Sequence, residues 1–482
     1  MILSNYEPKR VFHHFEAISQ IPRGSGNEKA VSDYIAAFAK NLGLKHIQDS
    51  YHNLIIFKAG TTGYENSPPV ILQGHLDMVC EKNAHIVHDF LVDPIKLYVD
   101  GDYIRAKGTT LGADNGIAVA YCMALLEATD IAHPPLEVVL TSDEEAGMSG
   151  AKNLDFSLLK ARKMVNLDSG RAGAFVAGSA AGTTAEYELP VKWEAPGAYT
   201  STYALTVSGL HGGHSGGDIH LERGNAIRIL AIMLNEISKK AEIRISKVGG
   251  GMKVNAIPRE AWAHIAIDPT HKACVLEAFE AYKPVMKSFF RVADADLELE
   301  LKPADPAKKV LTGPCGKNLI ASLLLLPNGV QSMSRDIEKL TAASSNIGVL
   351  ETFEETIKIS CMPRGASNEH TLQVEDKISA LADLAGAKYS FLQRSPAWAF
   401  NPDSGILKAF TSYYEKTHGD KPMVTAIHGG LECGIFSEEL PGIDIVSFGP
   451  NMHDLHTPEE RLSISSTDET WVFLCGALGE MK

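Results

Sequence analysis

Short apolar runs that end abruptly in polar residues limit most strongly what this chain can fold into. Each run has three or four residues, the length of a buried strand in an α/β sheet. Functional side chains gather at the carboxyl ends of such strands. The sequence therefore predicts an α/β domain with a mixed sheet. The runs are residues 70–72 before Gln73, Gly74 and His75, residues 138–140 before Thr141, Ser142, Asp143, Glu144 and Glu145, and residues 164–167 before Asp168.

The pattern of strand and helix signals changes near residue 186 and returns to α/β near residue 395. Between them we expect an inserted α+β domain at residues 186–394, made of two ferredoxin-like β-α-β-β-α-β halves. The second half is expected to use helices at residues 317–325 and 373–385 and strands near residues 329–332, 348–351, 357–361 and 389–393. The surrounding α/β domain would then comprise residues 1–185 and 395–482.

One helix carries an explicit start signal. Ser25 and Glu28 form the pattern of a capping box, and apolar residues then recur at helical spacing until Gly43. The pattern predicts an amphipathic surface helix whose first turn is capped by these two side chains.

Charge and cysteine usage exclude several classes of partner. The 482 residues include 45 Lys and Arg against 59 Asp and Glu, a net charge of -14, which disfavours nucleic acid and anionic membranes. Seven scattered cysteines without a C-x-x-C pair argue against a disulfide framework and indicate a reducing compartment. There is no N-terminal apolar region and no apolar run near the length of a membrane span. We expect a cytoplasmic protein without nucleic-acid or membrane partners.

Five segments place histidine or acidic residues at strand ends or helix starts. Two imidazoles with several carboxylates and no thiolate suit zinc, cobalt or manganese. An aspartate shared by two cations holds them about 3.5–4 Å apart in co-catalytic hydrolases. Asp114 also precedes a helical pattern, so a helix N-cap is the alternative for that residue. The segments are His75-Leu76-Asp77, Gly112-Ala113-Asp114-Asn115-Gly116, Asp143-Glu144-Glu145, Asp168 and His456-Thr457-Pro458.

The spacing within two of these segments predicts distinct roles. Residues two apart in an extended segment share a face, so Asp77 can orient the imidazole of His75. Neighbouring residues point in opposite directions, so Glu144 and Glu145 can divide the work. One would ligate a metal, and the other would stay free to take a proton from a bound water.

Together these motifs resemble those of the M20 family of di-zinc metallopeptidases, and the likeness runs from Ile21-Pro22 to the C-terminal helix. The segment from His75 to Lys82 and the long insertion are most similar to the aminoacyl-histidine dipeptidase branch. The resemblance implies a zinc-exopeptidase-like fold and hydrolysis of Xaa-His dipeptides such as β-alanyl-histidine. An N-acyl-amino-acid deacylase, a tripeptidase and a non-catalytic metal-binding scaffold are the alternatives, although a scaffold would not need Glu144.

The resemblance also implies a cofactor and its ligands. Two zinc ions are expected, with cobalt or manganese as substitutes, and Glu144 is implied as the proton acceptor. Asp77 is implied to clamp His75, and the peptide bond between Asp114 and Asn115 is implied to be cis. The implied ligands are His75 and Asp168 for one ion, Glu145 and His456 for the other, and Asp114 between the two.

The inserted domain is implied to act as a lid that contributes substrate-binding residues. His214 is implied to stabilise the oxyanion, with His211 as the alternative. Asn255 and Arg364 are implied to hold the backbone and the terminal carboxylate of the substrate, since the arginine fork meets a carboxylate with two hydrogen bonds. A solvated arginine at a strand end is the alternative for Arg364. The resemblance favours a homodimer formed through this domain.

Overall fold

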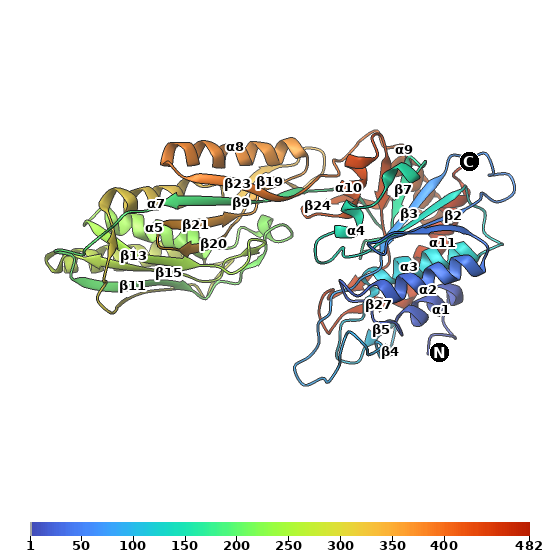
Figure 1. Ribbon diagram of the computed structural model, residues 1–482, viewed down its shortest axis with the longest axis horizontal. Coiled ribbons are helices and arrows are strands. Elements are labelled where there is room, and N and C mark those ends of the chain that lie inside the picture. The colour runs from blue at the N-terminus through green and yellow to red at the C-terminus, as the bar shows by residue number, and fades with distance from the viewer. Residues whose placement is uncertain (1) are drawn as a thin grey trace. The chain divides into compact units, whose positions relative to one another are not determined.

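The computed structural model describes residues 2–482, which fall into two compact units (Figure 1). Unit 1 comprises Met1–Gly178, Phe400–Ala426 and Leu431–Lys482, and unit 2 comprises Ser179–Ala399 and Ile427–Gly430. Unit 2 extends beyond both expected boundaries, residues 186 and 394. It also takes in Ile427–Gly430, a segment that the sequence pattern assigned to the surrounding domain.

Unit 1 is built on an eight-stranded mixed sheet in the order β1-β2-β6-β3-β7-β25-β8-β24. The four central strands run parallel, with His75 opposite Thr141 and Gln73 opposite Asn166. The three strands predicted from the apolar runs, β3, β6 and β7, therefore end side by side, and the predicted α/β class is confirmed. The strands are β1 (Lys45–Gln48), β2 (Leu54–Lys58), β3 (Val70–His75), β6 (Leu136–Thr141), β7 (Lys163–Asn166), β8 (Ala174–Ser179), β24 (Met423–Ile427) and β25 (Asp444–Ser447).

Five helices of unit 1, α1, α2, α3, α9 and α11, contribute to one hydrophobic core. Helix α3 is buried on nearly all sides and packs against α1 and β3. None of the helices described within residues 2–482 has the length and hydropathy that a membrane span requires. The helices are α1 (Lys9–Ile18), α2 (Lys29–Asn41), α3 (Ala113–Glu127), α4 (Ser149–Lys152), η1 (Phe156–Leu158), α9 (Gly405–His418), α10 (Glu432–Glu439) and α11 (Ile464–Gly479).

A smaller four-stranded sheet in unit 1 has the order β26-β27-β5-β4. Its strands are β4 (Leu97–Asp100), β5 (Tyr103–Ala106), β26 (Met452–His453) and β27 (Arg461–Ser463). The loop between β26 and β27, residues 454–460, contains His456. This ligand candidate is therefore held by a hairpin outside the main sheet.

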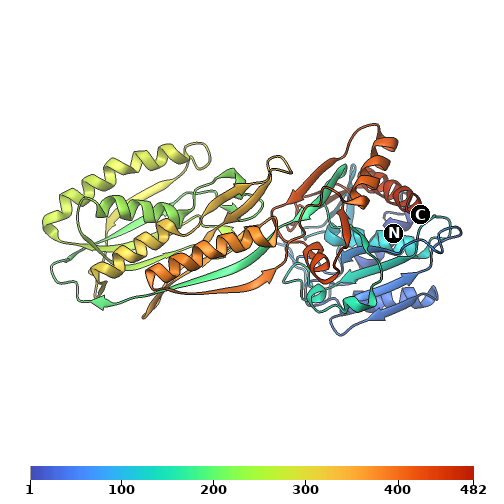
Figure 2. The same cartoon turned by 90° about the horizontal axis from the view of Figure 1, so that it is seen from above.

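Unit 2 has an eleven-stranded sheet with helices on one face, visible from above in Figure 2. The order is β16-β11-β15-β13-β20-β21-β9-β22-β19-β18, and β23 pairs with β9. The strands are β9 (Ala181–Pro190), β11 (Ser201–Ser208), β13 (Ile243–Gly250), β15 (Ala261–Ile267), β16 (Glu298–Pro303), β18 (Gly329–Met333), β19 (Thr341–Ser345), β20 (Ile347–Thr352), β21 (Thr356–Cys361), β22 (Arg364–Gly365) and β23 (Lys388–Ser395).

Four α-helices, two short 3-10 helices and two short strand pairs complete unit 2. The pairs are β10 (Trp193–Glu194) with β17 (Val310–Leu311) and β12 (Gly213–His214) with β14 (Ala256–Ile257). The helices are η2 (Ile219–Leu221), α5 (Ala226–Ser238), η3 (Pro269–His271), α6 (Lys272–Phe290), α7 (Gly313–Leu325) and α8 (Asn368–Ala385).

The two halves of unit 2 are nested rather than consecutive. One half follows the order β11-α5-β13-β15-α6-β16, with its strands adjacent as β16-β11-β15-β13. The other follows β9-α7-β20-β21-α8-β23, so the first half is inserted between β9 and α7. A strand forms near residues 329–332 as expected, but this strand, β18, pairs with β19 at the far edge of the sheet and is not part of this half. The first strand is β9, which lies more than a hundred residues earlier in the chain.

Helix α2 forms where its apolar spacing predicts, but the capping box does not. Glu28 makes no side-chain cap at the start of the helix. Instead, Ser25 Oγ donates to Asp77 Oδ2 over 2.8 Å, and Glu28 Oε1 accepts from the backbone N–H of Asp143 over 3.1 Å. Both side chains are used to hold segments that carry candidate site residues.

Candidate metal centre

The strand ends of unit 1 bring the predicted ligands together. His75 is the last residue of β3, Asp168 follows β7 by two residues, and Glu145 follows β6. Asp114 lies at the start of α3, where its own backbone is not helical. The N-cap position of α3 is Gly112, and both carboxylate oxygens of Asp114 contact histidine side chains, which speaks against the N-cap alternative for Asp114. The peptide bond between Asp114 and Asn115 is cis, which confirms the prediction.

The ligand candidates form two groups that share Asp114. One is His75, Asp114 and Asp168, and the other is Asp114, Glu145 and His456; within each, the ligand atoms lie within 4.8 Å of one another. Asp114 Oδ1 lies 3.2 Å from His75 Nε2, and its Oδ2 lies 3.3 Å from His456 Nε2. Each carboxylate oxygen thus faces a different group, as a bridging ligand requires.

Glu144 is also close to this cluster. A third group of atoms within the same distance joins His75, Glu144 and Glu145. Burial and the neighbouring carboxylates, Glu432 first among them, raise the pKa of Glu144 to about 8, against the opposing effect of His75. A buried carboxyl with a raised pKa beside other acids is a typical candidate for proton transfer.

Asp77 is the centre of a small hydrogen-bond network. Its Oδ1 lies 3.2 Å from His75 Nδ1 and accepts from the backbone N–H of Glu144 over 3.0 Å. Its Oδ2 accepts from Ser25 and from the backbone N–H of Glu145 over 3.2 Å. Burial opposes ionisation, but these partners, led by His75, lower the pKa of Asp77 to about 2. The predicted contact to His75 is present, and Asp77 additionally fixes the backbone of both glutamates.

Crowded acidic groups give the cluster its electrostatic character. Burial and the charge of Asp114 raise the pKa of Asp168 well above its ordinary value. Hydrogen bonds to Asp114 and Glu145 raise the pKa of His456 to about 10. Both shifts express an excess of negative charge that divalent cations would neutralise. The donors are only oxygen and imidazole nitrogen, so the residues fit zinc, cobalt or manganese.

Two buried charges that the sequence pattern did not single out support the backbone of this cluster. Arg23 Nη1 donates to the carbonyl oxygens of Leu76 and Asp77 over 2.9 and 3.0 Å, and its Nη2 donates to that of Gly112. Glu460 accepts backbone N–H groups of the segment that ends at Asp114. The pKa of Glu460 is raised, because the effect of burial outweighs that of these backbone hydrogen bonds, which lower it.

A second buried acid, Glu432, lies beneath the strand ends. Its Oε2 accepts from Gln73 Nε2 over 2.5 Å and from Thr141 Oγ1 over 2.6 Å. Asn166 Nδ2 in turn donates to Gln73 Oε1. The Oδ1 atom of Asn166 accepts from the backbone N–H of Asp168 over 3.2 Å. This chain of hydrogen bonds connects α10 to the ends of β3, β6 and β7.

In unit 2 the structure brings His214, Asn255 and Arg364 close to one another. The backbone N–H of Ser215, next to His214, donates to the carbonyl of Asn255 over 2.9 Å. A Cβ on Gly216 would lie 3.1 Å from the His214 ring and 3.3 Å from Arg364 Nε. Arg364 is 5% exposed, and its Nε has no hydrogen-bond partner in the described part of the chain. It is therefore not the solvated arginine of the alternative.

The two candidate histidines of unit 2 differ in their surroundings. His214 Nδ1 accepts the backbone N–H groups of Gly216 and Gly217 over 3.3 and 3.0 Å, which leaves the proton of the neutral ring on Nε2. Burial and the charge of Arg364 lower the pKa of His214. His211 Nδ1 instead lies 3.3 Å from Asp294 Oδ1, and its side chain is half exposed. His214 can thus donate from Nε2.

His428, which motif spacing did not reveal, belongs to the same part of unit 2. Its Nε2 lies 2.7 Å from Ser344 Oγ, and Ser344 is the cross-strand partner of Arg364. Burial and the charge of Arg364 lower the pKa of His428 to about 3. A neutral imidazole therefore lies near the buried guanidinium.

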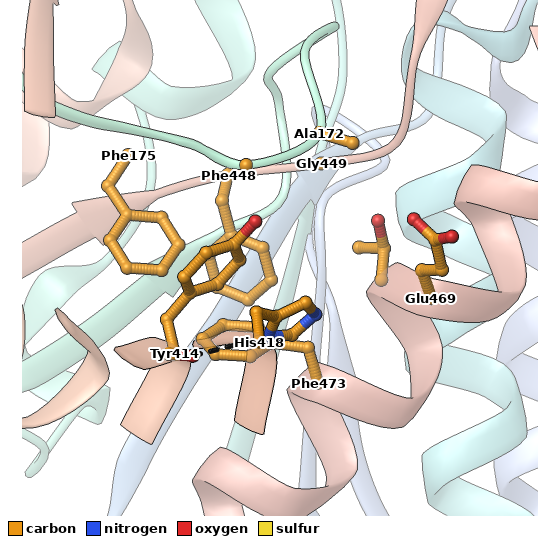
Figure 3. Close-up of a pocket in the computed structure, with 10 residues that line it drawn as sticks. Ala172, Phe175, Tyr414, His418, Phe448, Gly449, Glu469 and Phe473 are labelled. Carbon is orange, nitrogen blue, oxygen red and sulfur yellow. Dashed lines mark hydrogen bonds between the residues drawn. The ribbon is translucent and has the colours of Figure 1, made fainter. Parts of the chain in front are cut away.

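A separate cavity in unit 1 lies among aromatic side chains and does not include any of the ligand candidates (Figure 3). It is bordered by Phe175, Phe473, Glu469 and the stacked pair Tyr414 and His418, whose ring centroids are 4.0 Å apart. Its volume of about 30 Å³ is enough for water but not for a dipeptide. We assign it no part in the chemistry.

The chain is similar to known peptidases over its full length. It is 36% identical over 479 residues to the cytosol non-specific dipeptidase of Escherichia coli, covering 99% of both chains. Its structure matches the aminoacylhistidine dipeptidase of Vibrio alginolyticus with a TM-score of 0.92 and 37% identity, over 100% of this chain and 98% of that one.

A more distant structure shows the same fold. The aminopeptidase PepT of Bacillus cereus matches with a TM-score of 0.56 at 15% identity, over 99% of both chains. The sequence profile of peptidase family M20/M25/M40 matches residues 71–479, the span that contains every ligand candidate of the cluster. The resemblance predicted from the motifs is confirmed: the chain belongs to the M20/M25/M40 peptidase family.

Proposed function

We propose that this chain is a metal-dependent dipeptidase that hydrolyses Xaa-His dipeptides such as β-alanyl-histidine. The observation that carries the proposal is the position of Glu144, a partly buried carboxyl beside two groups of ligand candidates that share Asp114. The similarity to proteins named as a cytosol non-specific dipeptidase and an aminoacylhistidine dipeptidase supports the substrate class.

We propose that the cluster binds two divalent cations, zinc in the first place, with cobalt or manganese as substitutes. His75 and Asp168 would hold one, Glu145 and His456 would hold the other, and Asp114 would bridge them. The opposite orientation of the two Asp114 oxygens supports the bridging role. Asp114, Glu145 and Asp168 crowd negative charge together, which supports the binding of two divalent cations rather than one.

When bound, the cations would polarise the scissile carbonyl and lower the pKa of a water molecule. Glu144 is the proposed acceptor of the water proton and its donor to the leaving amine. Asp77 keeps His75 in one orientation and fixes the backbone N–H groups of Glu144 and Glu145. Because the backbone of Glu144 and that of Glu145 are held by the same aspartate, the proposed base and the proposed ligand keep the same position relative to each other.

The substrate-binding residues are proposed to lie in unit 2, the lid of the family resemblance. Arg364 would bind the terminal carboxylate, and His214, as a neutral Nε2–H donor, would stabilise the oxyanion. Asn255 would hold the substrate backbone. The unpartnered Arg364 Nε within the described residues and the two backbone N–H groups on His214 Nδ1 support these roles.

We further propose that the protein is a cytoplasmic homodimer. The cytosolic name of the E. coli relative and the family resemblance support this. Light scattering on the purified protein should then give twice the 52.1 kDa mass of the chain.

A substrate screen on the purified protein tests the proposed function. β-Alanyl-histidine and other Xaa-His dipeptides should be hydrolysed fastest, ahead of tripeptides and N-acetyl amino acids. A chelator should abolish the activity, and zinc, cobalt or manganese should restore it. Preference for N-acetyl amino acids or tripeptides would favour the alternative activities, and absence of hydrolysis with metal bound would favour a scaffold.

A further inference from the structure

Glu460 is a buried carboxylate that binds the backbone beside the proposed bridging ligand. Its Oε2 accepts the N–H groups of Leu111 and Gly112 over 2.8 and 3.0 Å. Its Oε1 accepts those of Ala113 and Asp114 over 2.8 and 3.3 Å. Four consecutive backbone donors therefore point at one side chain, which is 2% exposed. Use of both oxygens as double acceptors is the pattern of an ionised carboxylate.

The position of Glu460 in the chain connects two ligand segments. It closes the β26–β27 loop four residues after His456, while the backbone that it binds ends at Asp114. His456 itself takes a φ of 62°, a left-handed conformation that a non-glycine residue adopts only when its surroundings hold it there. The loop and the Asp114 segment are thus joined through one side chain.

Arg23 braces the opposite side of the same segment. Its guanidinium joins the carbonyl of Gly112 to those of Leu76 and Asp77, directly after His75. Gly112 has a φ of 70°, and a Cβ there would lie 2.6 Å from Arg23 Nη2. A glycine is therefore required where the arginine passes. Together the two charges connect the segments that carry His75, Asp114 and His456.

The two cation positions do not depend equally on this frame. His75 and Asp168 are carried by β3 and β7, neighbouring strands paired in parallel inside the main sheet. His456 lies in a hairpin loop, and its side chain is 49% exposed. Pairing of β3 with β7 fixes the positions of His75 and Asp168. The position of His456 relative to Asp114 must be fixed by contacts outside that sheet.

We propose that Glu460 is a positioning residue that holds Asp114 and His456 in one frame, so that the cation position of Asp114, Glu145 and His456 depends on it. The proposal rests on the proposed function, because it requires two cations at this centre. The position of His75, Asp114 and Asp168 depends on Glu460 much less. Supporting residues of this kind typically change metal affinity by about 10–100-fold when they are replaced.

The test compares Glu460→Gln with Glu459→Gln in the full chain. Glutamine keeps the shape but turns an NH2 group toward backbone N–H groups, so two donors lose their acceptor. Glu459 is the adjacent exposed glutamate, and its nearest charged partner is Arg105 at 3.6 Å, which makes it the matched control. Binding of Zn²⁺ and Co²⁺ is measured by equilibrium dialysis of the metal-free protein, with the absorption spectrum of bound Co²⁺ as a second signal.

Wild type and Glu459→Gln should bind two equivalents with the same affinities. Glu460→Gln should bind one equivalent normally and the second about 10–100-fold more weakly. Excess metal should restore its kcat toward wild type, which a general loss of structure would not allow. Two equivalents with wild-type affinities, or equal weakening of both, would overturn the proposal.

Two further outcomes are separated by design. If Glu460→Gln does not fold by circular dichroism, Glu460→Asp is measured instead, since it keeps both acceptor oxygens but is one methylene shorter. It should weaken the second equivalent by a smaller factor, and unchanged affinities would again overturn the proposal. A wild-type chain that binds no divalent cation would overturn the proposed function itself.

Discussion

Arg364 is a buried guanidinium that forms no ion pair with an acidic side chain among residues 2–482. Desolvation alone lowers its pKa, to about 10, and neutral side chains such as Ser344 and His428 lie around it. A buried charge that is not paired costs stability. Such a residue is retained when a ligand supplies the missing charge, and a substrate carboxylate has the matching shape.

Replacement of Arg364 by alanine should therefore weaken substrate binding without unfolding the protein. We expect KM for dipeptides with a free carboxylate to rise and kcat/KM to fall by a factor of about 30 or more, which corresponds to about 2–5 kcal/mol of lost stabilisation. The melting temperature should stay the same or increase, because an unpaired buried charge is removed. Steady-state kinetics and thermal unfolding measure both effects.

Arg394→Ala provides the control for Arg364→Ala. Arg394 is half exposed and pairs with Glu375, so its loss should leave KM unchanged. An unchanged KM in Arg364→Ala would remove Arg364 from the carboxylate site.

Single residues also mark the limit of what the sequence could reveal. Short motifs at strand ends pointed to His75, Asp114, Glu145, Asp168 and His456 because ligands must come from strand ends and loops that meet. Glu460 and Glu432 carry no such signal, since each acts through hydrogen bonds to residues far away in the chain. The misread capping box had the same cause: its side chains bind Asp77 and Asp143.

At the level of elements, β3 and α3 pack closely beside the cluster. A Cβ on Gly74 would lie 2.5 Å from Asn115 Oδ1 and 2.7 Å from the Ala118 side chain. Asn115 uses that oxygen to accept the backbone N–H of His75, and its Nδ2 donates to the carbonyl of Leu167. One side chain thus joins the ends of β3 and β7 to the start of α3.

Gly74→Ala should disturb this junction. Overpacking of a buried contact costs about 1–3 kcal/mol of unfolding free energy, and displacement of Asn115 should also lower metal affinity and kcat. Gly316→Ala in α7 is the matched change, because a Cβ there meets nothing within 4 Å; it should be neutral or stabilising by up to about 1 kcal/mol. Denaturant unfolding compares the two, and equal stability of both variants would contradict the packing argument.

Elements were predicted best where their signal is local. The strands β3, β6 and β7 and the helix α2 formed where apolar runs and helical spacing placed them. The nesting of unit 2 could not be predicted in this way, because β9 pairs with β21 and β23, which lie far along the chain. Pairing partners follow from the whole fold, whereas the periodicity of a strand follows from its own residues.

For the whole molecule, we propose that Glu144, a carboxylate which does not bind metal, completes a metal centre for peptide hydrolysis. Family membership establishes the chemistry to be expected, and the shared Asp114 with the neighbouring Glu144 supports its assignment to particular residues. A cluster that only stores metal would need the ligands but would have no use for Glu144.

Hydrolysis of β-alanyl-histidine by Glu144→Gln, with metal content determined on the same sample, tests the role of Glu144 as the base. Glutamine keeps the size of the side chain but cannot accept the water proton, so kcat should fall by about 10²–10⁴-fold while metal content stays at the wild-type level. Near-normal turnover by the metal-loaded variant would contradict the assignment of Glu144 as the base. Loss of metal together with activity would instead make Glu144 a ligand.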